Sequence, residues 1–406
     1  MNFKKLLKTC VAGLSLFVMV GSASAAITSD INVYGASAQF IMWRDNAAAY
    51  MTSQGCTGAQ SAQLGSGTPW RADGRNAITR ATCGGVTRYF RTTAKASYDG
   101  ILAIQGNTTH PNRVIDSGCT AFERKMINPA TCDWGTGQCT GSTACAPVTV
   151  GASDVPVECF EQVSNGNLQG PLGGAWTARN FVNNPITWSG AAPCKPLIVP
   201  FAFFVNNSVH KTGATISNIT KDNAELIFNG QVYDWSDIVD VDGTSFDALP
   251  IQVCLRHAGS GTHASIDGYL TNALINTQDN SGPYNFYHND GSSDELRCVN
   301  GSGSWTGTGA IGYADADQTL GTTYASTTRI ALNGVTPSAN TIQNGTYNFY
   351  GLQQIYGVTA SDPLCTFASN PANITNPLWV AACKMEFMRS GACDAFPLQW
   401  VGASCP

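Results

Sequence analysis

The stretch CLRHAGSGTH, residues 254–263, joins two different hydrophobic patterns. Before it, apolar residues alternate from Ile251 to Leu255, as in a half-buried β-strand. After it, apolar residues recur every four positions from Ile266 to Leu274, which places them on one face of a helix. The stretch is therefore predicted to contain a strand end, a glycine turn and a helix start.

This turn carries residues that suit an anion. A helix start has unpaired backbone N–H groups and a partial positive charge. Gly259 and Gly261 let the backbone approach a ligand, Ser260 and Thr262 add hydroxyl donors, and Arg256 adds a two-pronged cation. Two interpretations are open at this point. The turn is either a cradle for an oxyanion, or an ordinary capped helix start with Arg256 in a surface ion pair.

Residues 1–25 are predicted to be a secretory signal peptide. Lys4, Lys5 and Lys8 form its basic part, and an apolar run from Val11 to Val20 follows that is too short to span a bilayer. Ala23-Ser24-Ala25 forms the cleavage site. The alternative is a retained anchor helix. We expect a soluble mature chain in the periplasm or outside the cell, not embedded in a membrane.

Charge and cysteine content narrow the class of protein further. Loss of three lysines with the signal peptide moves the net charge from −5 to −8, and no basic run exists to neutralise phosphates, so nucleic acid is not an expected partner. Of 15 cysteines, Cys10 lies in the signal peptide; the remaining 14 predict structural disulfides, because none forms a C-x-x-C pair. No metal ligand set or cofactor site is predicted.

Strands alternate with helices along the chain, which predicts an α/β fold with a largely parallel sheet. A nearly continuous apolar run from Leu197 to Val205 is typical of a strand buried on both faces. The expected strand 31–34 and helix 39–51, the expected helix Lys221–Phe228 capped by Thr220, and an expected helix over 377–390 supply the other main elements.

The chain is predicted to form two lobes. Lobe one covers residues 26–199, with cysteine-rich insertions at about 106–145 and 160–195 held by disulfides. Lobe two covers 200–317, and residues 318–406 return to lobe one and extend beyond it. A monomer is expected.

Five short motifs resemble those of the substrate-binding proteins of phosphate-type ABC importers, and they occur in the same order. They are GASAQF at 35–40, GASDVP at 151–156, the segment from Asn218 to Trp235, RHAGSGT at 256–262 and GAIGY at 309–313. The resemblance implies a two-lobed type II periplasmic binding protein fold, with a ligand cleft between the lobes that closes by a hinge motion.

The resemblance also implies the ligand contacts by position. They are Gln39 and Phe40 at the first helix start, Ser97 with Thr92 and Thr93 as rivals, Asp154, Arg256, and Ser260, Gly261 and Thr262. Asp154 would accept a hydrogen bond from a protonated oxyanion; the alternative is that it caps a helix or turn after Ser153. A carboxylate beside an anion favours a ligand that still carries a proton, such as hydrogen phosphate, over sulfate.

Two positions depart from the pattern of the family. Gln39 stands where the family has a threonine, and Ala258 stands where it has an aspartate that orients the arginine. We expect the loss of this aspartate to make the pocket more positive and roomier, which leaves the identity of the anion open.

The implied function is transport, without catalysis. The chain would capture phosphate or a similar oxyanion for an ABC permease. An extracellular interaction protein that uses the same fold for another ligand or none is the main alternative. A phosphoester hydrolase is weaker, because Gly259-Ser260-Gly261 is not a G-x-S-x-G elbow. His257 and His263 lie six residues apart, too far for a helical zinc pair.

Overall fold

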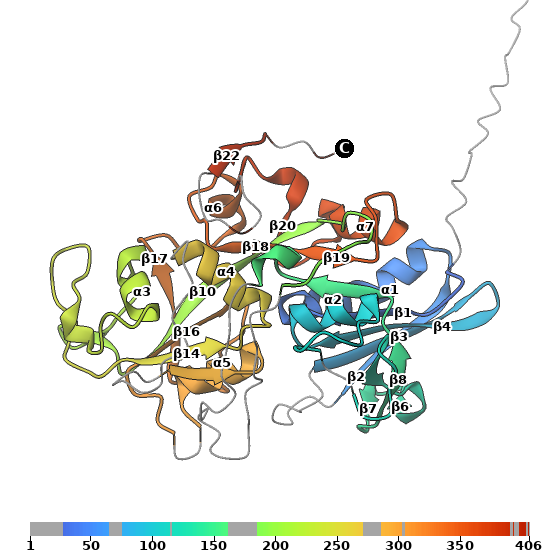
Figure 1. Ribbon diagram of the computed structural model, residues 1–406, viewed down its shortest axis with the longest axis horizontal. Coiled ribbons are helices and arrows are strands. Elements are labelled where there is room, and N and C mark those ends of the chain that lie inside the picture. The colour runs from blue at the N-terminus through green and yellow to red at the C-terminus, as the bar shows by residue number, and fades with distance from the viewer. Residues whose placement is uncertain are drawn as a thin grey trace, which may run out of the picture.

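The computed structural model describes residues 27–64, 75–113, 116–160, 185–270, 286–302, 305–389, 393, 398–402 and 405. Two mixed β-sheets lie side by side and are joined by strands that run from one to the other (Figure 1). The expected signal peptide lies outside the described residues, as does most of the expected insertion at 160–195. Within the described ranges, every helix is too short or too polar to cross a bilayer.

The sheet of lobe one has, among the described residues, the strand order β19-β9-β1-β4-β3-β2-β7-β6. The strands are β1 (Ile31–Gly35), β2 (Thr57–Leu64), β3 (Arg75–Cys83), β4 (Val86–Ala94), β6 (Cys132–Asp133), β7 (Gln138–Cys139), β9 (Val150–Ser153) and β19 (Gln354–Tyr356). Because β9, β1 and β4 are parallel, their carboxyl ends lie at one edge of the sheet. Ser37, Ser97 and Asp154 follow these three ends.

The helices α1 (Phe40–Ser53) and α2 (Ser97–Gln105) cover opposite faces of this sheet. Neighbouring residues of a strand point to opposite faces, and Val33 packs in the cluster that contains α1, whereas Tyr34 packs with Ala103 of α2. Gly100 allows α2 to approach closely, because a Cβ atom there would lie 2.3 Å from the carbonyl oxygen of Tyr34.

The sheet of lobe two has the order β13-β17-β10-β16-β14-β15 in the part of the chain that the structure describes, with β18 and β20 also paired to β10. The strands are β10 (Leu197–Asn206), β13 (Asn218–Ile219), β14 (Gln252–Arg256), β15 (Phe286–Asn289), β16 (Ala310–Asp315), β17 (Thr327–Leu332), β18 (Tyr350–Leu352) and β20 (Val380–Ala381). The expectation of a largely parallel sheet is wrong here. Strand β10 enters from lobe one and runs antiparallel to both of its neighbours, β16 and β17.

Helices also cover both faces of this second sheet. On one face lie α3 (Lys221–Phe228) and α4 (Gly261–Leu270), and Phe228 and Ile266 pack there with Tyr313. On the other face lies α5 (Ser292–Asn300), where Val299 packs near Cys254. As predicted, Thr220 caps α3, and its hydroxyl accepts a hydrogen bond from the Asn223 N–H at 3.1 Å.

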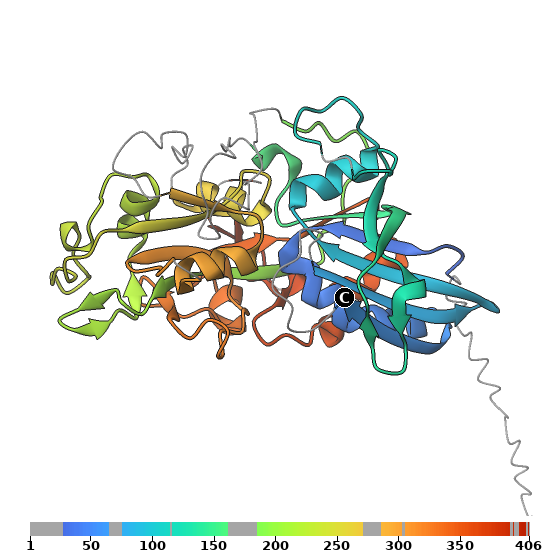
Figure 2. The ribbon, with the colours of Figure 1, turned by 90° about the horizontal axis from the view of Figure 1, so that it is seen from below.

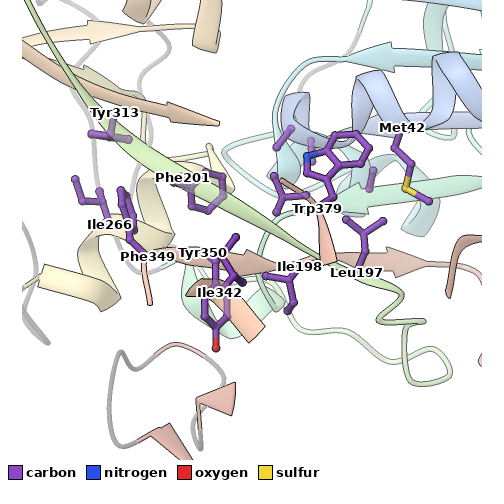
Figure 3. Packing of buried hydrophobic residues seen from close by; sticks show 14 of the residues in the cluster. Met42, Leu197, Ile198, Phe201, Ile266, Tyr313, Ile342, Phe349, Tyr350 and Trp379 are labelled. Atoms are coloured by element: carbon purple, nitrogen blue, oxygen red, sulfur yellow. The ribbon is translucent and has the colours of Figure 1, made fainter. Parts of the chain in front are cut away.

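Strand β10 connects the two lobes. Its residue Pro200 pairs with β18, whereas the next residue, Phe201, pairs with β16. Another connection is β18 followed by β19, which joins the sheet of lobe one. Figure 3 shows buried side chains along this connection, and Figure 2 shows the two lobes side by side from below. Lobe two was expected to end at residue 317. Strand β17 begins at Thr327 and pairs with β10, so the second sheet continues past that boundary.

The expected helix over 377–390 is wrong. This segment contains β20, a 3-10 turn η6 (Ala382–Lys384) and β21 (Phe387–Arg389), which pairs with β22 (Leu398–Trp400). The apolar residues have helical spacing, but Val380 pairs with Ile198 of the distant strand β10 instead. The helices α6 (Ala339–Gln343) and α7 (Pro363–Ser369) precede it.

Disulfides hold the peripheral segments, as predicted. In the insertion at 106–145, strands β5 (Glu123–Ile127) and β8 (Thr143–Pro147) form a two-stranded antiparallel sheet. The seven disulfides among the described residues join Cys56–Cys83, Cys119–Cys145, Cys132–Cys139, Cys159–Cys393, Cys194–Cys365, Cys254–Cys298 and Cys383–Cys405. The remaining short elements are β11 (His210–Lys211), β12 (Ala214–Thr215), η1 (Ser37–Gln39), η2 (Pro129–Thr131), η3 (Val157–Cys159), η4 (Trp235–Asp237) and η5 (Pro371–Asn373).

Candidate functional site

Helix starts from the two lobes contact each other where the lobes meet, and we call this region the interlobe junction. Ser37 and Ser97 come from lobe one, and Gly261 and Ser292 come from lobe two. The Ser97 hydroxyl accepts a hydrogen bond from the Gly261 N–H at 3.2 Å. The hydroxyl oxygens of Ser37 and Ser292 lie 3.3 Å apart. The lobes therefore contact each other directly through these helix starts.

Two cations of lobe one also reach lobe two. Arg75, at the start of β3, donates to the hydroxyl of Ser293. Lys95 lies 3.6 Å from the carboxylate of Asp290, measured from Nζ to Oδ2. These polar contacts add to the helix-start contacts and favour the closed arrangement of the lobes.

Asp154 lies at the centre of the junction and is only 1% exposed. Its Oδ2 atom accepts from the Thr262 hydroxyl at 3.2 Å and from the Ser97 hydroxyl at 3.4 Å. Its backbone N–H donates back to Ser97 Oγ at 3.2 Å. Asp154 Oδ1 is buried and has no hydrogen-bond partner among the described residues. A buried acceptor of this kind suits a ligand that brings a hydroxyl donor.

The environment of Asp154 favours its protonated form. Burial raises the pKa of Asp154 to about 7, and the nearby negative charge of Asp315 adds to this. The positive charge of Arg256 and the hydrogen bonds from Thr262 and Ser97 lower the pKa and offset part of the rise. Near neutral pH the carboxyl group can therefore exchange a proton with a ligand at low cost.

Arg256 ends β14 and is 1% exposed, which rules out the alternative of a surface ion pair. Its Nη1 atom donates to the Ser292 hydroxyl at 3.1 Å, and its Nη2 atom donates to the Asp290 carbonyl at 2.8 Å. Its backbone N–H donates to the Tyr313 hydroxyl at 3.1 Å. Its Nε is buried without a partner in the described ranges, so the guanidinium retains a donor for a ligand.

Buried acids surround Arg256. Burial raises the pKa of Asp294 to about 7 and that of Glu295 well above its usual value, and the positive charge of Arg256 lowers both in part. Asp315 is also buried. Arg256 therefore lies among buried acidic side chains of lobe two, and burial favours the neutral forms of Asp294 and Glu295. The more positive pocket expected from Ala258 stays a prediction.

Ala258 does not enlarge the site. The residue is 2% exposed and packs in an apolar cluster with residues of both lobes, among them Tyr98 and Val155 of lobe one and Ala264 of α4. An aspartate in this position would bury its charge against apolar side chains. The alanine therefore fits the apolar contact between the lobes.

Gln39 and Phe40, two of the predicted ligand residues, are engaged in contacts within the protein. The Gln39 Nε2 atom donates to the carbonyls of Ser153 at 2.9 Å and Gln354 at 3.2 Å, and its Oε1 atom accepts from Trp43. Gln39 thus joins strands of lobe one, which does not agree with a role as a side-chain donor to a ligand. The Phe40 N–H donates to the carbonyl of Ser37.

Ser260 behaves as a helix cap. Its hydroxyl accepts from the backbone N–H of His263, three residues later, at 3.4 Å. Ser97, Asp154, Arg256, Gly261 and Thr262, in contrast, lie together at the junction. The rivals Thr92 and Thr93 lie within β4, and Thr93 donates to Asn76.

The two histidines next to the motif are buried in lobe two. His263 Nδ1 lies 2.5 Å from the Tyr313 hydroxyl, and burial lowers the pKa of His263 to about 3, so this ring is neutral. His257 Nε2 lies 3.5 Å from Asp290 Oδ1. Among the described residues, no group of three or more His, Cys, Asp or Glu side chains is arranged to hold a metal ion.

Several residues of the junction were missed in the sequence, foremost Ser292, Ser293, Glu295 and Asp315. A signal was present at 287–295, where a short strand is followed by Gly-Ser-Ser-Asp-Glu, the same strand, glycine and hydroxyl pattern as at 254–263. Asp294 and Glu295 gave this segment a polar appearance, which hid a helix whose first turn is buried.

Comparison with known proteins agrees with this architecture. A family model described as a PBP superfamily domain matches residues 191–372, which include lobe two and the return through β19. No curated protein matches the chain. The predicted resemblance is thereby confirmed over residues 191–372. The two sheets described above confirm the predicted two-lobed α/β fold class.

Solved structures of binding proteins are similar at low identity. One is described as a phosphate ABC transporter substrate-binding protein with bound phosphate from Clostridium perfringens; it has 14% identity and a TM-score of 0.44, over 83% of this chain and 91% of that chain. Another is the phosphate binding protein from Stenotrophomonas maltophilia, with 14% identity and a TM-score of 0.41, over 80% of this chain and 78% of that chain. At these values nothing about the ligand of this chain follows from them.

Proposed function

We propose that the chain is an exported substrate-binding protein that captures a small oxyanion carrying a proton, most simply phosphate, for an ABC importer. The observation that carries this proposal is the position of Asp154. Its buried, unpartnered Oδ1 lies beside the start of α4, where backbone N–H groups, the Thr262 hydroxyl and Arg256 attract an anion.

The chemistry of such a site selects the protonation state of the ligand. The helix start and Arg256 favour negative oxygens, whereas an ionised Asp154 repels them unless a proton lies between the two groups. Hydrogen phosphate and hydrogen arsenate carry that proton near neutral pH. Sulfate does not, so it can bind only while Asp154 itself holds the proton, and the two groups repel each other once Asp154 ionises above pH 7.

Ligand entry requires the lobes to separate. In the described conformation Ser97 bonds directly to the Gly261 N–H, so a ligand that uses this N–H replaces the contact between the lobes. We expect the ligand to bind an open form and then to join the two lobes in place of these direct hydrogen bonds.

Calorimetric titration of the disulfide-intact protein with phosphate, arsenate and sulfate tests the proposal. We expect saturable binding of phosphate and arsenate from pH 7 to about pH 9, and weaker binding of sulfate that falls about tenfold per pH unit above pH 7, because Asp154 must be protonated for sulfate to bind. The Asp154→Asn variant should narrow this difference, since an amide can donate to sulfate. Absence of binding by all three anions contradicts the proposal.

Export, a monomeric state and binding without turnover are parts of the same proposal. N-terminal sequencing of the secreted protein should start at Ala26 if residues 1–25 are cleaved as a signal peptide. Size-exclusion chromatography should show a monomer. A binding protein of this kind delivers its ligand without turnover, so a chromogenic phosphate ester should remain intact; turnover that Ser260→Ala abolishes would support the hydrolase instead.

An extracellular interaction protein is the second candidate. The observation in its favour is exposed apolar surface away from the junction, with Trp400 of β22 73% exposed and Phe122 of the disulfide-held insertion 54% exposed. This candidate predicts that removal of the junction charges leaves the function of the protein intact, whereas the binding protein requires them.

A further inference from the structure

Arg256 lacks the acid that would orient it within its own motif, since residue 258 is an alanine. An arginine side chain loses much conformational freedom when it is fixed, so an oriented guanidinium in a binding site needs a partner that holds it. In this protein the partner must come from another segment of the chain.

The structure contains such a partner on α5 and β16. Arg256 Nη1 donates to Ser292 Oγ at 3.1 Å, and the Ser292 hydroxyl in turn donates to Asp315 Oδ1 at 3.3 Å. The two hydrogen bonds run in the same direction, from the cation through the hydroxyl to the carboxylate. Each bond in such a chain polarises and strengthens the next.

Ser292 and Asp315, the two residues that follow Arg256 in this series of hydrogen bonds, are each held in place by the fold. Asp315 pairs with Phe201 of the crossing strand β10, and its Oδ2 atom accepts from Gln318 Nε2 at 2.5 Å. Ser292 begins α5, which the Cys254–Cys298 disulfide joins to β14, the strand that ends at Arg256. The distance between the arginine and its partner is thus set by covalent and strand contacts.

We propose that Ser292 and Asp315 are positioning residues of the oxyanion site, and that Asp315 orients Arg256 through the Ser292 hydroxyl in place of the missing acid at residue 258. This inference rests on the proposed function. It assigns the orientation of Arg256 to lobe two residues outside the 254–263 motif. It also explains how residue 258 can be an apolar contact between the lobes while the arginine keeps a fixed direction.

Binding of inorganic phosphate by Ser292→Ala, Ser292→Thr and Asp315→Asn tests the inference. A hydrogen bond to a charged group contributes about 1.5–3 kcal/mol, so Kd should rise about 10- to 100-fold in Ser292→Ala and Asp315→Asn. Ser292→Thr keeps the hydroxyl and should stay within about 3-fold of wild type. Ser236→Ala, an exposed serine of the same lobe, is the matched control.

A second measurement does not depend on any ligand. The side-chain Nε–H signal of Arg256 in a ¹⁵N-labelled sample reports whether the guanidinium is fixed. We expect this signal to broaden or shift in Ser292→Ala and Asp315→Asn and to be retained in Ser292→Thr. Ser37→Ala removes the other hydroxyl contact of Ser292, the one across the lobes, and should leave the Arg256 signal unchanged.

The outcomes separate the two proposals. If wild type binds no oxyanion, the proposed function fails, and the Arg256 signal alone decides whether Ser292 and Asp315 position it. An unchanged signal in a folded Ser292→Ala or Asp315→Asn variant overturns the inference. An unchanged phosphate Kd in both variants, with binding by wild type, overturns it as well.

Discussion

The hydroxyl of Ser97, in lobe one, accepts the backbone N–H of Gly261, the first residue of helix α4 in lobe two, at 3.2 Å. A residue of one lobe thus satisfies an unpaired donor at the helix start of the other. The same hydroxyl donates to Asp154. The closed arrangement and the candidate anion site therefore depend on the same few atoms.

Gly261→Ala is expected to prevent closure. An added Cβ atom would lie 2.5 Å from Ser97 Oγ and 2.7 Å from Asp154 Cβ, closer than such atoms can approach. The ligand-free variant should be more open, with a larger radius of gyration in small-angle X-ray scattering, and should bind phosphate more weakly. Gly135→Ala, in the disulfide-held insertion, meets only the Asp133 side chain at 3.3 Å and is the control. An equally compact Gly261→Ala protein would contradict the prediction.

Arg256→Lys is expected to weaken both stability and binding. Lysine keeps the charge but cannot reach Ser292 Oγ and the Asp290 carbonyl together as the guanidinium does. The free energy of unfolding of the ligand-free protein should fall by about 1–3 kcal/mol, measured by denaturant unfolding, and Kd for phosphate should rise at least about tenfold.

Arg44→Lys is the matched control for Arg256→Lys. Arg44 forms an exposed pair with its neighbour Asp45, and such pairs contribute about 0–1 kcal/mol. Equal effects of the two substitutions would mean that the buried contacts of Arg256 do not fix it.

Segments that determine their own structure could be predicted from the sequence. The Thr220 cap and the apolar face of α3 lie within one helix, and the apolar run of β10 indicates burial by itself. The segment 377–390 could not be assigned in this way, because its apolar residues are used in pairing with β10, a strand about 180 residues earlier. Local spacing carries no information about such a distant partner.

The candidate site could likewise be predicted only where its residues lie in local motifs. Arg256, Gly261, Thr262 and Asp154 lie in short motifs, whose local chemistry suggests an anion. Ser292 is 36 residues from Arg256 in the chain, and only the sheet order brings the two side chains together. Burial also changes the chemistry of this segment, since the acidic side chains in the first turn of α5 are buried in the fold, which favours their neutral forms.

Stability is expected to fall as the pH rises from about 4 to 7. Burial raises the pKa values of Asp154 and Asp294 to about 7, whereas an unfolded aspartate has a pKa near 3.9. Between these values the folded state binds a proton that the unfolded state has lost. Each such carboxyl therefore lowers the free energy of unfolding by about 1.4 kcal/mol per pH unit in this window.

Thermal unfolding of the ligand-free protein at pH 5 and pH 7.5 measures this dependence. The melting temperature should be lower at pH 7.5, and Asp154→Asn should reduce the difference, because an amide does not titrate. Asp45→Asn changes an exposed aspartate and should leave the difference in melting temperature between the two pH values unchanged. A melting temperature that rises with pH in wild type would contradict the assignment of raised pKa values.

Removal of the Cys254–Cys298 disulfide is expected to cost more stability than removal of Cys132–Cys139. The first closes a segment of 44 residues and the second one of 7, so the entropy of the unfolded chain predicts losses of about 4 and about 2 kcal/mol for the paired Cys→Ala variants. The first bond also joins β14 to α5 and so holds Arg256 near Ser292. The loss of Cys254–Cys298 should therefore weaken phosphate binding as well, whereas the loss of Cys132–Cys139, in the insertion of lobe one, should not. Denaturant unfolding and calorimetry on both variants decide this, and equal phosphate affinities in the two would show that the disulfide does not contribute to the position of the arginine.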